Sequence, residues 1–294
     1  MNNTMWTADK WKDYELVDCS RGEKLERWGN VLLRRPDPTA IWPHTKPESL
    51  WKKNDGHYHR STKGGGSWTF SKKLPEYWTV SYKDLKFKVS PTGFKHTGLF
   101  PEQAVNWDWM SEAIKNDSRD IKVLNLFAYT GGATMALSAA GAEEVVHVDA
   151  SKGMIQWAKE NMELSHLSGN KIRFIVDDCV KFVEREKRRG RKYHAILMDP
   201  PSYGRGPNNE LWKLEEQIVP LIEKCLDILE DEPLFFLVNS YTTGFSATVL
   251  ENIMKMTVLK KYPNGKIQTG EVALPISDSE LVLPCGIYGK WTKE

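Results

Sequence analysis

From Ile121 onward, short apolar runs alternate along the chain with segments of helical periodicity. The apolar runs predict buried strands at 122–127, 144–150, 171–178, 194–199 and 233–240. The segments after them predict helices at 132–142, 151–167, 179–190, 208–230 and 246–256. Apolar strands that alternate with helices are typical of a parallel sheet covered on both faces. No helix of usable length separates the runs at 265–275 and 280–291, so we expect a closing antiparallel hairpin there.

The pattern is different before residue 100. Short polar and aromatic runs are broken at close spacing by turn signals such as RRPDPTAIWP (34–43) and SPTG (90–93). This part of the chain predicts a small β-rich domain over residues 1–100. A larger α/β domain is then expected over residues 101–294.

Charge and aromatic residues are unevenly distributed between these regions. Residues 1–110 hold 18 Lys and Arg against 13 Asp and Glu, whereas the remainder holds 23 against 26. Nine of the 12 tryptophans also lie before residue 111. A basic, aromatic region can contact nucleic acid through phosphate and base stacking, and the same tryptophans can equally form the core of a small domain.

Composition narrows the class of protein further. No run is long enough to span a membrane, and the N-terminal segment lacks the apolar core of a signal peptide. The cysteines are scattered and form no CxxC, at Cys19, Cys179, Cys225 and Cys285. His57 and His59 have the spacing of metal ligands on a strand, but no third ligand is nearby. We therefore expect a cytoplasmic protein without a membrane segment, disulfide framework or metal site.

Candidate ligand-binding residues follow the predicted strands. In an open α/β sheet, ligands lie outside the carboxyl ends of the strands where strand order reverses. The first strand leads into a tight turn at Thr130, Gly131 and Gly132. The second ends at Asp149, 18 residues after Gly131, where an acid can bind both hydroxyls of a ribose. The next strands end at Asp177–Asp178, Asp199 and Asn239–Ser240.

Two cofactor classes carry such a ribose, the dinucleotides and S-adenosylmethionine. The turn AYTGGATM does not contain the GxGxxG pattern that fits a pyrophosphate. Acids at the third and fourth strand ends would repel a pyrophosphate, but they suit an adenine amine and a cationic sulfonium. The pattern therefore favours S-adenosylmethionine.

Taken in order, LNLFAYTGGATMALSAAGAEEVVHVDASKGMIQWAKEN, DDCVKFV and MDPPSYGRG resemble the class I S-adenosylmethionine-dependent methyltransferases. Among these, the chain looks like the bacterial 23S rRNA methyltransferases that modify cytosine C5 or guanine N7. The resemblance covers roughly residues 95–245 and includes KHTGLFPEQ. It implies a Rossmann-like, mostly parallel sheet. Where the family usually has Leu-Asp-Gln-Arg, this chain has Pro101-Glu102-Gln103-Ala104, so an arginine that can serve the site is absent.

The resemblance also implies roles for individual residues. The methionine part of the cofactor would be lined by Phe127, Tyr129, Thr130 and Gly131. The ribose would be held by Asp149 and Ser151, and the adenine would face Asp178 and the backbone of Cys179. The pocket would be supported by Gln103 and Asn161.

The expected methyl acceptor is a nitrogen atom. Cytosine C5 reacts only after a cysteine thiolate adds to the ring, and the family members with this chemistry carry that cysteine after the fifth strand. Here the segment reads LVNSYTTG. DPPSY resembles the Asp-Pro-Pro-aromatic signature of amine methylases, in which the carboxylate and a proline carbonyl accept the amine hydrogens. Asp199 and Pro200 would do so here. The ring of Tyr203, displaced by one position, would either stack on the base or pack on its own loop.

Asn239 would either orient the acceptor or satisfy the backbone of its loop. We therefore expect a methyltransferase acting by direct in-line transfer on a base nitrogen of ribosomal or other RNA, with help from residues 1–100. The alternatives are a small-molecule or protein acceptor, cytosine C5 chemistry, and a non-catalytic module that binds the cofactor or RNA. The oligomeric state is open, with a dimer among the options.

Overall fold

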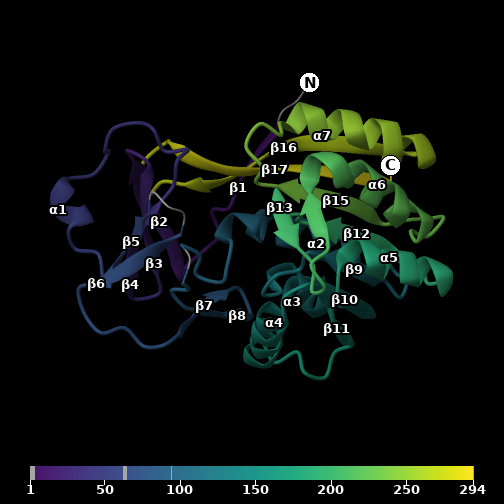
Figure 1. The fold of residues 1–294 in the computed structure, drawn as a ribbon, viewed down its shortest axis with the longest axis horizontal. Coiled ribbons are helices and arrows are strands. Elements are labelled where there is room, and N and C mark those ends of the chain that lie inside the picture. The colour runs from purple at the N-terminus through teal and green to yellow at the C-terminus, as the bar shows by residue number, and fades with distance from the viewer. Residues whose placement is uncertain (1–3, 62–64, 94, 294) are drawn as a thin grey trace. The chain divides into compact units, whose positions relative to one another are not determined.

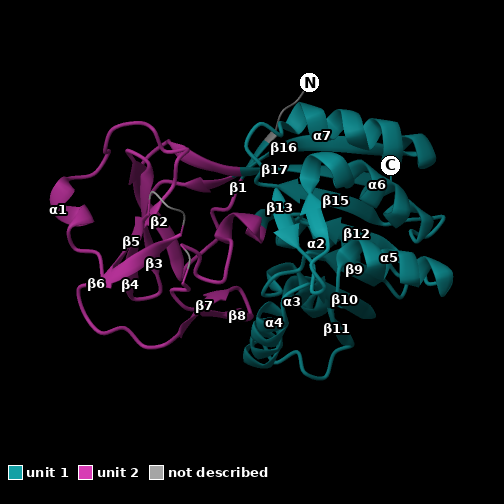
Figure 2. Ribbon diagram, in the orientation of Figure 1, with its two compact units in different colours: residues 1–6, 105–272, 286–294 teal, residues 7–104, 273–285 magenta. Residues whose placement is uncertain are grey.

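The computed structural model describes residues 4–61, 65–93 and 95–293, and the chain forms two compact units (Figure 2). Unit 1 consists of residues 1–6, 105–272 and 286–294, and unit 2 of residues 7–104 and 273–285. The apolar pattern assigned 273–285 to the larger domain. These residues belong to unit 2 because they pair with its first long strand: Ile276 forms a parallel bridge to Leu16, and Ser277 donates a hydrogen bond to Glu15.

The sheet of unit 1 confirms the predicted α/β class, and Figure 1 shows the helices around it. Its strand order is β1-β16-β17-β15-β12-β9-β10-β11. The pairs formed by β9, β10, β11, β12 and β15 are parallel, whereas β15 and β17 are antiparallel. The strand bounds are β1 Thr4–Thr7, β9 Lys122–Leu126, β10 Glu144–Asp149, β11 Ile172–Val176, β12 Ala195–Met198, β15 Phe235–Ser240, β16 Gly265–Pro275 and β17 Val282–Lys293.

Helices cover both faces of this sheet. Strand residues such as Leu124, Val146 and Phe236 are buried in one apolar cluster with Phe182 of α5 and Leu250 of α7. On the opposite face, α2 contacts β15, α3 contacts β9 and β10, and α4 contacts α3. The helix bounds are α2 Ala104–Lys115, α3 Gly132–Ala139, α4 Lys152–Leu164, α5 Cys179–Arg188, α6 Leu214–Asp227 and α7 Ala247–Met254, which continues into the π-helix η2 Lys255–Leu259.

The prediction of one helix over 208–230 is wrong in its first turns. Helix α6 begins at Leu214, and the residues before it form a hairpin of β13 (Tyr203–Arg205) and β14 (Leu211–Lys213). Asn209 has a φ of 66°, in the left-handed region that breaks a helix. A Gly-Pro-Asn-Asn turn therefore outweighs the helical spacing of the residues around it.

Strand order reverses beside β9. The chain adds β10 and β11 on one side of β9, then returns to add β12 and β15 on the other. The carboxyl ends of β9 and β12 therefore border the crevice where ligands bind in open α/β sheets. The residues singled out at strand ends lie along this edge of the sheet.

Unit 2 confirms the expected β-rich N-terminal region. It contains a five-stranded sheet of order β2-β3-β4-β5-β6 and a separate hairpin, β7-β8. Trp28 and Trp51 are fully buried, so at least these tryptophans form its core. The strand bounds are β2 Tyr14–Ser20, β3 Glu23–Trp28, β4 Val31–Pro36, β5 Gly56–Arg60, β6 Gly66–Phe70, β7 Trp78–Tyr82 and β8 Leu85–Val89. The short helices are α1 Glu48–Trp51 and η1 Pro101–Gln103.

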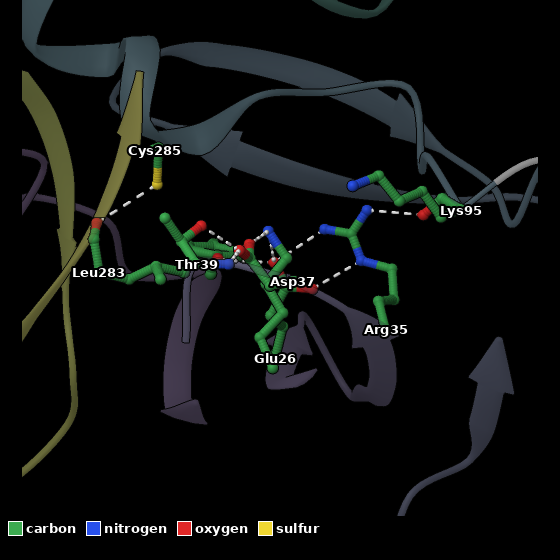
Figure 3. A network of polar contacts seen from close by, with 9 residues as sticks. Glu26, Arg35, Asp37, Thr39, Lys95, Leu283 and Cys285 are labelled. Carbon is green, nitrogen blue, oxygen red and sulfur yellow. Dashed lines mark hydrogen bonds and ion pairs between the residues drawn. The ribbon is translucent and has the colours of Figure 1, made fainter. Parts of the chain in front are cut away.

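A polar network lies inside unit 2 (Figure 3). Glu26 on β3 is fully buried and accepts two hydrogen bonds from the guanidinium of Arg35, at 2.6 and 2.8 Å. Arg35 also donates to the carbonyl of Lys95 at 2.8 Å. Burial opposes ionisation of Glu26, but Arg35 and Lys24 hold the pKa of its carboxyl down at about 2. Both charges are thus compensated inside the unit, as buried ions require.

Within the described ranges, no helix is both long and apolar enough to cross a membrane. No group of three or more His, Cys, Asp or Glu residues in that part of the chain is arranged to hold a metal ion. His57 and His59 are instead within hydrogen-bond distance of Glu23 and Thr69.

Candidate active site

The loop after β9, residues 127–131, has an unusual backbone. Phe127, Tyr129 and Gly131 have φ values of 54°, 52° and 84°. Two of these are non-glycine residues in the left-handed region, a conformation that costs energy and is concentrated at functional sites. The positive φ of Gly131 favours glycine, and a Cβ atom there would also be crowded, 3.1 Å from Met135 and 3.2 Å from Ala158.

Side chains from neighbouring elements hold this loop, which we call the cofactor loop. The buried amide of Asn161 on α4 donates to the carbonyl of Thr130 at 2.8 Å. The backbone nitrogen of Tyr129 donates to Asp149 at 2.9 Å. The cofactor loop is therefore tied both to the adjacent strand and to the helix that follows it.

A polar chain that the sequence analysis missed lies beneath the cofactor loop. The Asn125 amide donates to the hydroxyl of Thr134, which lies 2.9 Å from Nδ1 of His147. The Thr134 hydroxyl therefore bonds to both the Asn125 amide and the His147 imidazole. Burial lowers the pKa of His147 to about 3 and keeps it neutral. Polar residues inside the apolar runs of β9 and β10 are the signal that could have revealed this chain.

Asp149, at the end of β10, is the acid expected to hold a ribose. Its two carboxylate oxygens accept backbone N–H groups, one from Tyr129 at 2.9 Å and one from Ser151 at 2.8 Å. Burial raises its pKa, while these two hydrogen bonds act in the opposite direction. Ser151 is the N-cap of α4 and accepts from Met154. Each Asp149 oxygen has a second lone pair that a ligand hydroxyl can use.

The residues after β11, Asp177 to Cys179, mainly make contacts that stabilise neighbouring elements. Asp178 is the N-cap of α5 and accepts from the backbone nitrogen of Lys181 at 2.9 Å. Asp177 forms an ion pair with Arg185. The Cys179 sulfur accepts the backbone N–H of Phe127 at 3.3 Å, so this thiol joins the ends of β9 and β11.

The segment Asp199–Tyr203 follows β12, and we call it the acceptor loop after the role predicted for it from the sequence. Asp199 is half-buried, and its backbone nitrogen lies 3.4 Å from the carbonyl oxygen of Leu126. Pro200 is buried, whereas Tyr203 is 58% exposed on β13. The Ser202 hydroxyl lies 2.7 Å from that of Thr242, beyond β15. The Tyr203 ring is therefore presented to solvent.

Two further residues of the predicted site, Asn239 and Gln103, are buried. Asn239 is buried, and its carbonyl oxygen accepts a hydrogen bond from Asn106 on α2 at 3.0 Å. The acceptor atom of Asn239 is thus engaged within unit 1. Gln103 is buried in η1, which belongs to unit 2.

The donor and acceptor set at this edge of the sheet fits S-adenosylmethionine. Asp149 offers an acceptor for ribose hydroxyls. Helix α3 begins at the cofactor loop without a side-chain cap, so a ligand carboxylate could accept from its first N–H groups. At Gly132, a Cβ would lie 2.6 Å from Trp107. Glycine at position 132 therefore leaves room for the Trp107 ring beside the first turn of α3.

Comparisons with known proteins show the family to which this fold belongs. A family model described as S-adenosylmethionine-dependent methyltransferase matches residues 51–219. The crystal structure of a SAM-dependent methyltransferase from Agrobacterium tumefaciens is 35% identical, with a TM-score of 0.94, covering 100% of this chain and 95% of that one.

Curated relatives include ribosomal RNA large subunit methyltransferases K/L. The one from Shewanella frigidimarina is 34% identical over 49% of this chain and 20% of its own, and one from Shewanella baltica is 30% identical over 85% and 34%. The chain thus spans about a fifth to a third of the length of these relatives.

Fold and site together define a Rossmann-like methyltransferase unit. The chain belongs to the S-adenosylmethionine-dependent methyltransferase family, and S-adenosylmethionine is its cofactor. The cofactor predicted from the strand-end residues and the family that the ordered motifs resemble are both confirmed.

Proposed function

We propose that this protein methylates a base nitrogen in ribosomal RNA by direct transfer from S-adenosylmethionine. The observation that supports it most is the acceptor loop, in which a half-buried carboxylate at a strand end precedes two prolines beside the cofactor loop. The cofactor supplies an electrophilic methyl group on a sulfonium. The protein has to hold the attacking nitrogen in line with that group.

In this proposal, the acceptor loop aims the nitrogen. The Asp199 carboxylate and the Pro200 carbonyl accept the hydrogens of an exocyclic amine, or fix the base that carries a ring nitrogen. Neither proline can donate a hydrogen bond, and both have a restricted φ, so the acceptors keep one geometry. The exposed ring of Tyr203 stacks on the base.

The cysteines support direct transfer over a covalent intermediate. Cys19, Cys179 and Cys225 are buried, and Cys285 is partly buried. Burial raises the pKa of each of these thiols, and the pKa of Cys19 reaches about 12. A thiol must ionise to attack a pyrimidine ring. Cytosine C5 chemistry therefore has no activated nucleophile in this chain.

The cofactor assignments follow the same geometry. Phe127, Tyr129, Thr130 and Gly131 border the methionine part, because their loop carries the strained backbone and leads into α3. Asp149 and Ser151 hold the ribose, and Asp178 with Cys179 faces the adenine. Asn161 acts through the Thr130 carbonyl, and Gln103 is assigned to the pocket by resemblance alone.

RNA as the acceptor rests on the relatives and on unit 2. The matched Shewanella proteins are named for ribosomal RNA methylation. In unit 2, Lys86 is exposed on β8, and the Lys88 ammonium lies 4.8 Å from the ring centroid of Tyr77, which is 49% exposed. Lysines beside an exposed ring provide phosphate contact and a stacking surface. Action on ribosomal RNA would place the protein in the cytoplasm.

Nucleoside mass spectrometry tests the proposal. Ribosomal RNA from a strain that lacks the gene should miss one N-methylated nucleoside, and purified protein with S-adenosylmethionine should restore it. Loss of 5-methylcytidine would favour C5 chemistry instead. If no nucleoside changes, the acceptor is a small molecule or a protein. Restoration in vivo by Asp199→Ala would identify a non-catalytic binding module.

A further inference from the structure

Trp212 lies between the two loops of the proposed site. Its indole nitrogen donates to the carbonyl oxygen of Pro201 at 2.6 Å, a distance at the short end for such a bond. Its ring centroid lies 5.0 Å from that of Phe127, with the planes inclined at 55°. The side chain is only 5% exposed. One residue thus contacts both the acceptor loop and the cofactor loop.

The β13-β14 hairpin directs this side chain inward. Trp212 pairs with Gly204 in the hairpin, and the backbone nitrogen of Leu214 donates to the carbonyl of Ser202 at 3.0 Å. At the turn, Glu210 forms an ion pair with Lys181 on α5 at 2.6 Å. The hairpin is therefore fastened at both ends. Trp212 is held against the apolar core of unit 1.

We propose that Trp212 is a positioning residue for methyl transfer, which sets the acceptor loop in register with the cofactor loop. This inference rests on the proposed function of the acceptor loop. Pro201 follows Pro200 directly, and both have a restricted φ, so fixing the Pro201 carbonyl also fixes the orientation of Pro200 and Asp199. In-line transfer depends steeply on such alignment, because a displacement of about 1 Å can lower a rate about a hundredfold.

The chain offers a matched control. Trp291 is fully buried in the same apolar cluster, and its indole nitrogen also donates to a backbone carbonyl, that of Tyr262, at 3.0 Å. Trp212→Phe and Trp291→Phe each remove one indole N–H and keep an aromatic ring. Comparable shifts in melting temperature are expected for both. Only Trp212→Phe removes a contact with the acceptor loop.

The first measurement is steady-state methyl transfer to ribosomal RNA from a strain that lacks the gene. For Trp212→Phe we expect kcat to fall at least tenfold, with the KM for S-adenosylmethionine within twofold of wild type. Trp291→Phe should keep its kcat within twofold. Equal kcat values for the two variants would overturn the proposal, because loss of a buried bond anywhere would then have the same effect.

A second measurement does not depend on the acceptor. Amide hydrogen exchange is followed with and without S-adenosylhomocysteine. In wild type and in Trp291→Phe, the ligand should protect residues 127–131 and also residues 202–205. In Trp212→Phe, protection should remain at 127–131 and be lost at 202–205. Protection of 202–205 that persists in Trp212→Phe, or is missing in wild type, contradicts the role of Trp212. If wild type binds the ligand but methylates no RNA, the proposed function fails. The exchange experiment then decides by itself whether Trp212 connects the two loops.

Discussion

The Asp149 carboxylate lies 2.9 Å from the backbone nitrogen of Tyr129, so the acid at the end of β10 holds the loop at the end of β9. The residue assigned to the cofactor ribose therefore also stabilises the left-handed conformation of Tyr129. Under the proposed assignment, ligand binding and loop geometry depend on one side chain, so a change at Asp149 should affect both.

Replacing Asp149 with Asn tests this dual role. The amide keeps one acceptor oxygen but loses the charge, and a hydrogen bond to a charged group contributes about 1.5–3 kcal/mol. We expect the Kd for S-adenosylhomocysteine to rise about ten- to hundredfold in calorimetry. Asp177→Asn is the control, because that carboxylate is already paired with Arg185 and should leave the affinity nearly unchanged. Unaltered binding by Asp149→Asn would remove the ribose assignment.

Asp199→Asn separates catalysis from cofactor binding. The proposed role of Asp199 is to position the acceptor, so its neutral isostere should lower kcat by about a hundredfold or more. The affinity for S-adenosylhomocysteine, measured by calorimetry, should stay within twofold. Asp227→Asn is the control, because it removes an exposed carboxylate on α6 that pairs with Lys187, and it should retain activity. A fully active Asp199→Asn enzyme would contradict the acceptor role.

His147 should make the free energy of unfolding decrease as the solution becomes acidic. Its pKa is about 3 in the folded protein, because of burial, against about 6.5 in an unfolded chain. The unfolded state therefore binds more protons between these values, and stability falls by about 1.36 kcal/mol per pH unit as pH decreases from about 6.5 toward 3. His147→Asn keeps an acceptor for Thr134 without this titration.

Denaturant unfolding at several pH values checks this expectation. The difference in stability between wild type and His147→Asn should be constant above about pH 7 and shrink as the solution is acidified. The same difference at pH 5 and pH 7 would show that His147 does not stay neutral in the folded state.

Lys290 on β17 should make the stability of the protein depend on alkaline pH. Its ammonium lies 3.5 Å from the ring centroid of Trp6 and 4.4 Å from that of Trp109, and burial lowers its pKa to about 7. An unfolded lysine titrates at about 10.4, so the contribution of Lys290 to stability rises between about pH 7 and pH 10 and is smallest below that window.

Lys290→Met should therefore stabilise the protein most at pH 7 and below. Its advantage over wild type in denaturant unfolding should shrink as the pH increases toward 10. Because other groups titrate in this range, only the difference between the two proteins is informative. An advantage that does not change with pH would show that the rings of Trp6 and Trp109 keep Lys290 charged throughout.

Much of unit 1 could be predicted from local patterns. The apolar runs from 122 to 240 correspond to β9, β10, β11, β12 and β15, and the acids and glycines that follow them lie along one edge of the sheet. Parallel strands joined by helices all end at the same edge, so chain order alone brings these residues together. Asp149 and Gly131 could be found this way without coordinates.

The contacts that connect the site could not be predicted. The sequence shows that Asn125 and His147 interrupt apolar strands, but only the register of β9 and β10 places them side by side. The apolar spacing around Trp212 suggested a helix, whereas a turn at 206–209 forms a hairpin that carries the indole to Pro201. Likewise, 273–285 pairs with β2 in unit 2.

The sequence by itself therefore determined the α/β class, the cofactor and the residues at the strand ends, because the period of apolar residues sets each element and its buried face. The tertiary structure decided which of those residues hold one another in place. Strand register and the packing of distant segments depend on contacts far apart in the chain, and local periodicity carries no information about them.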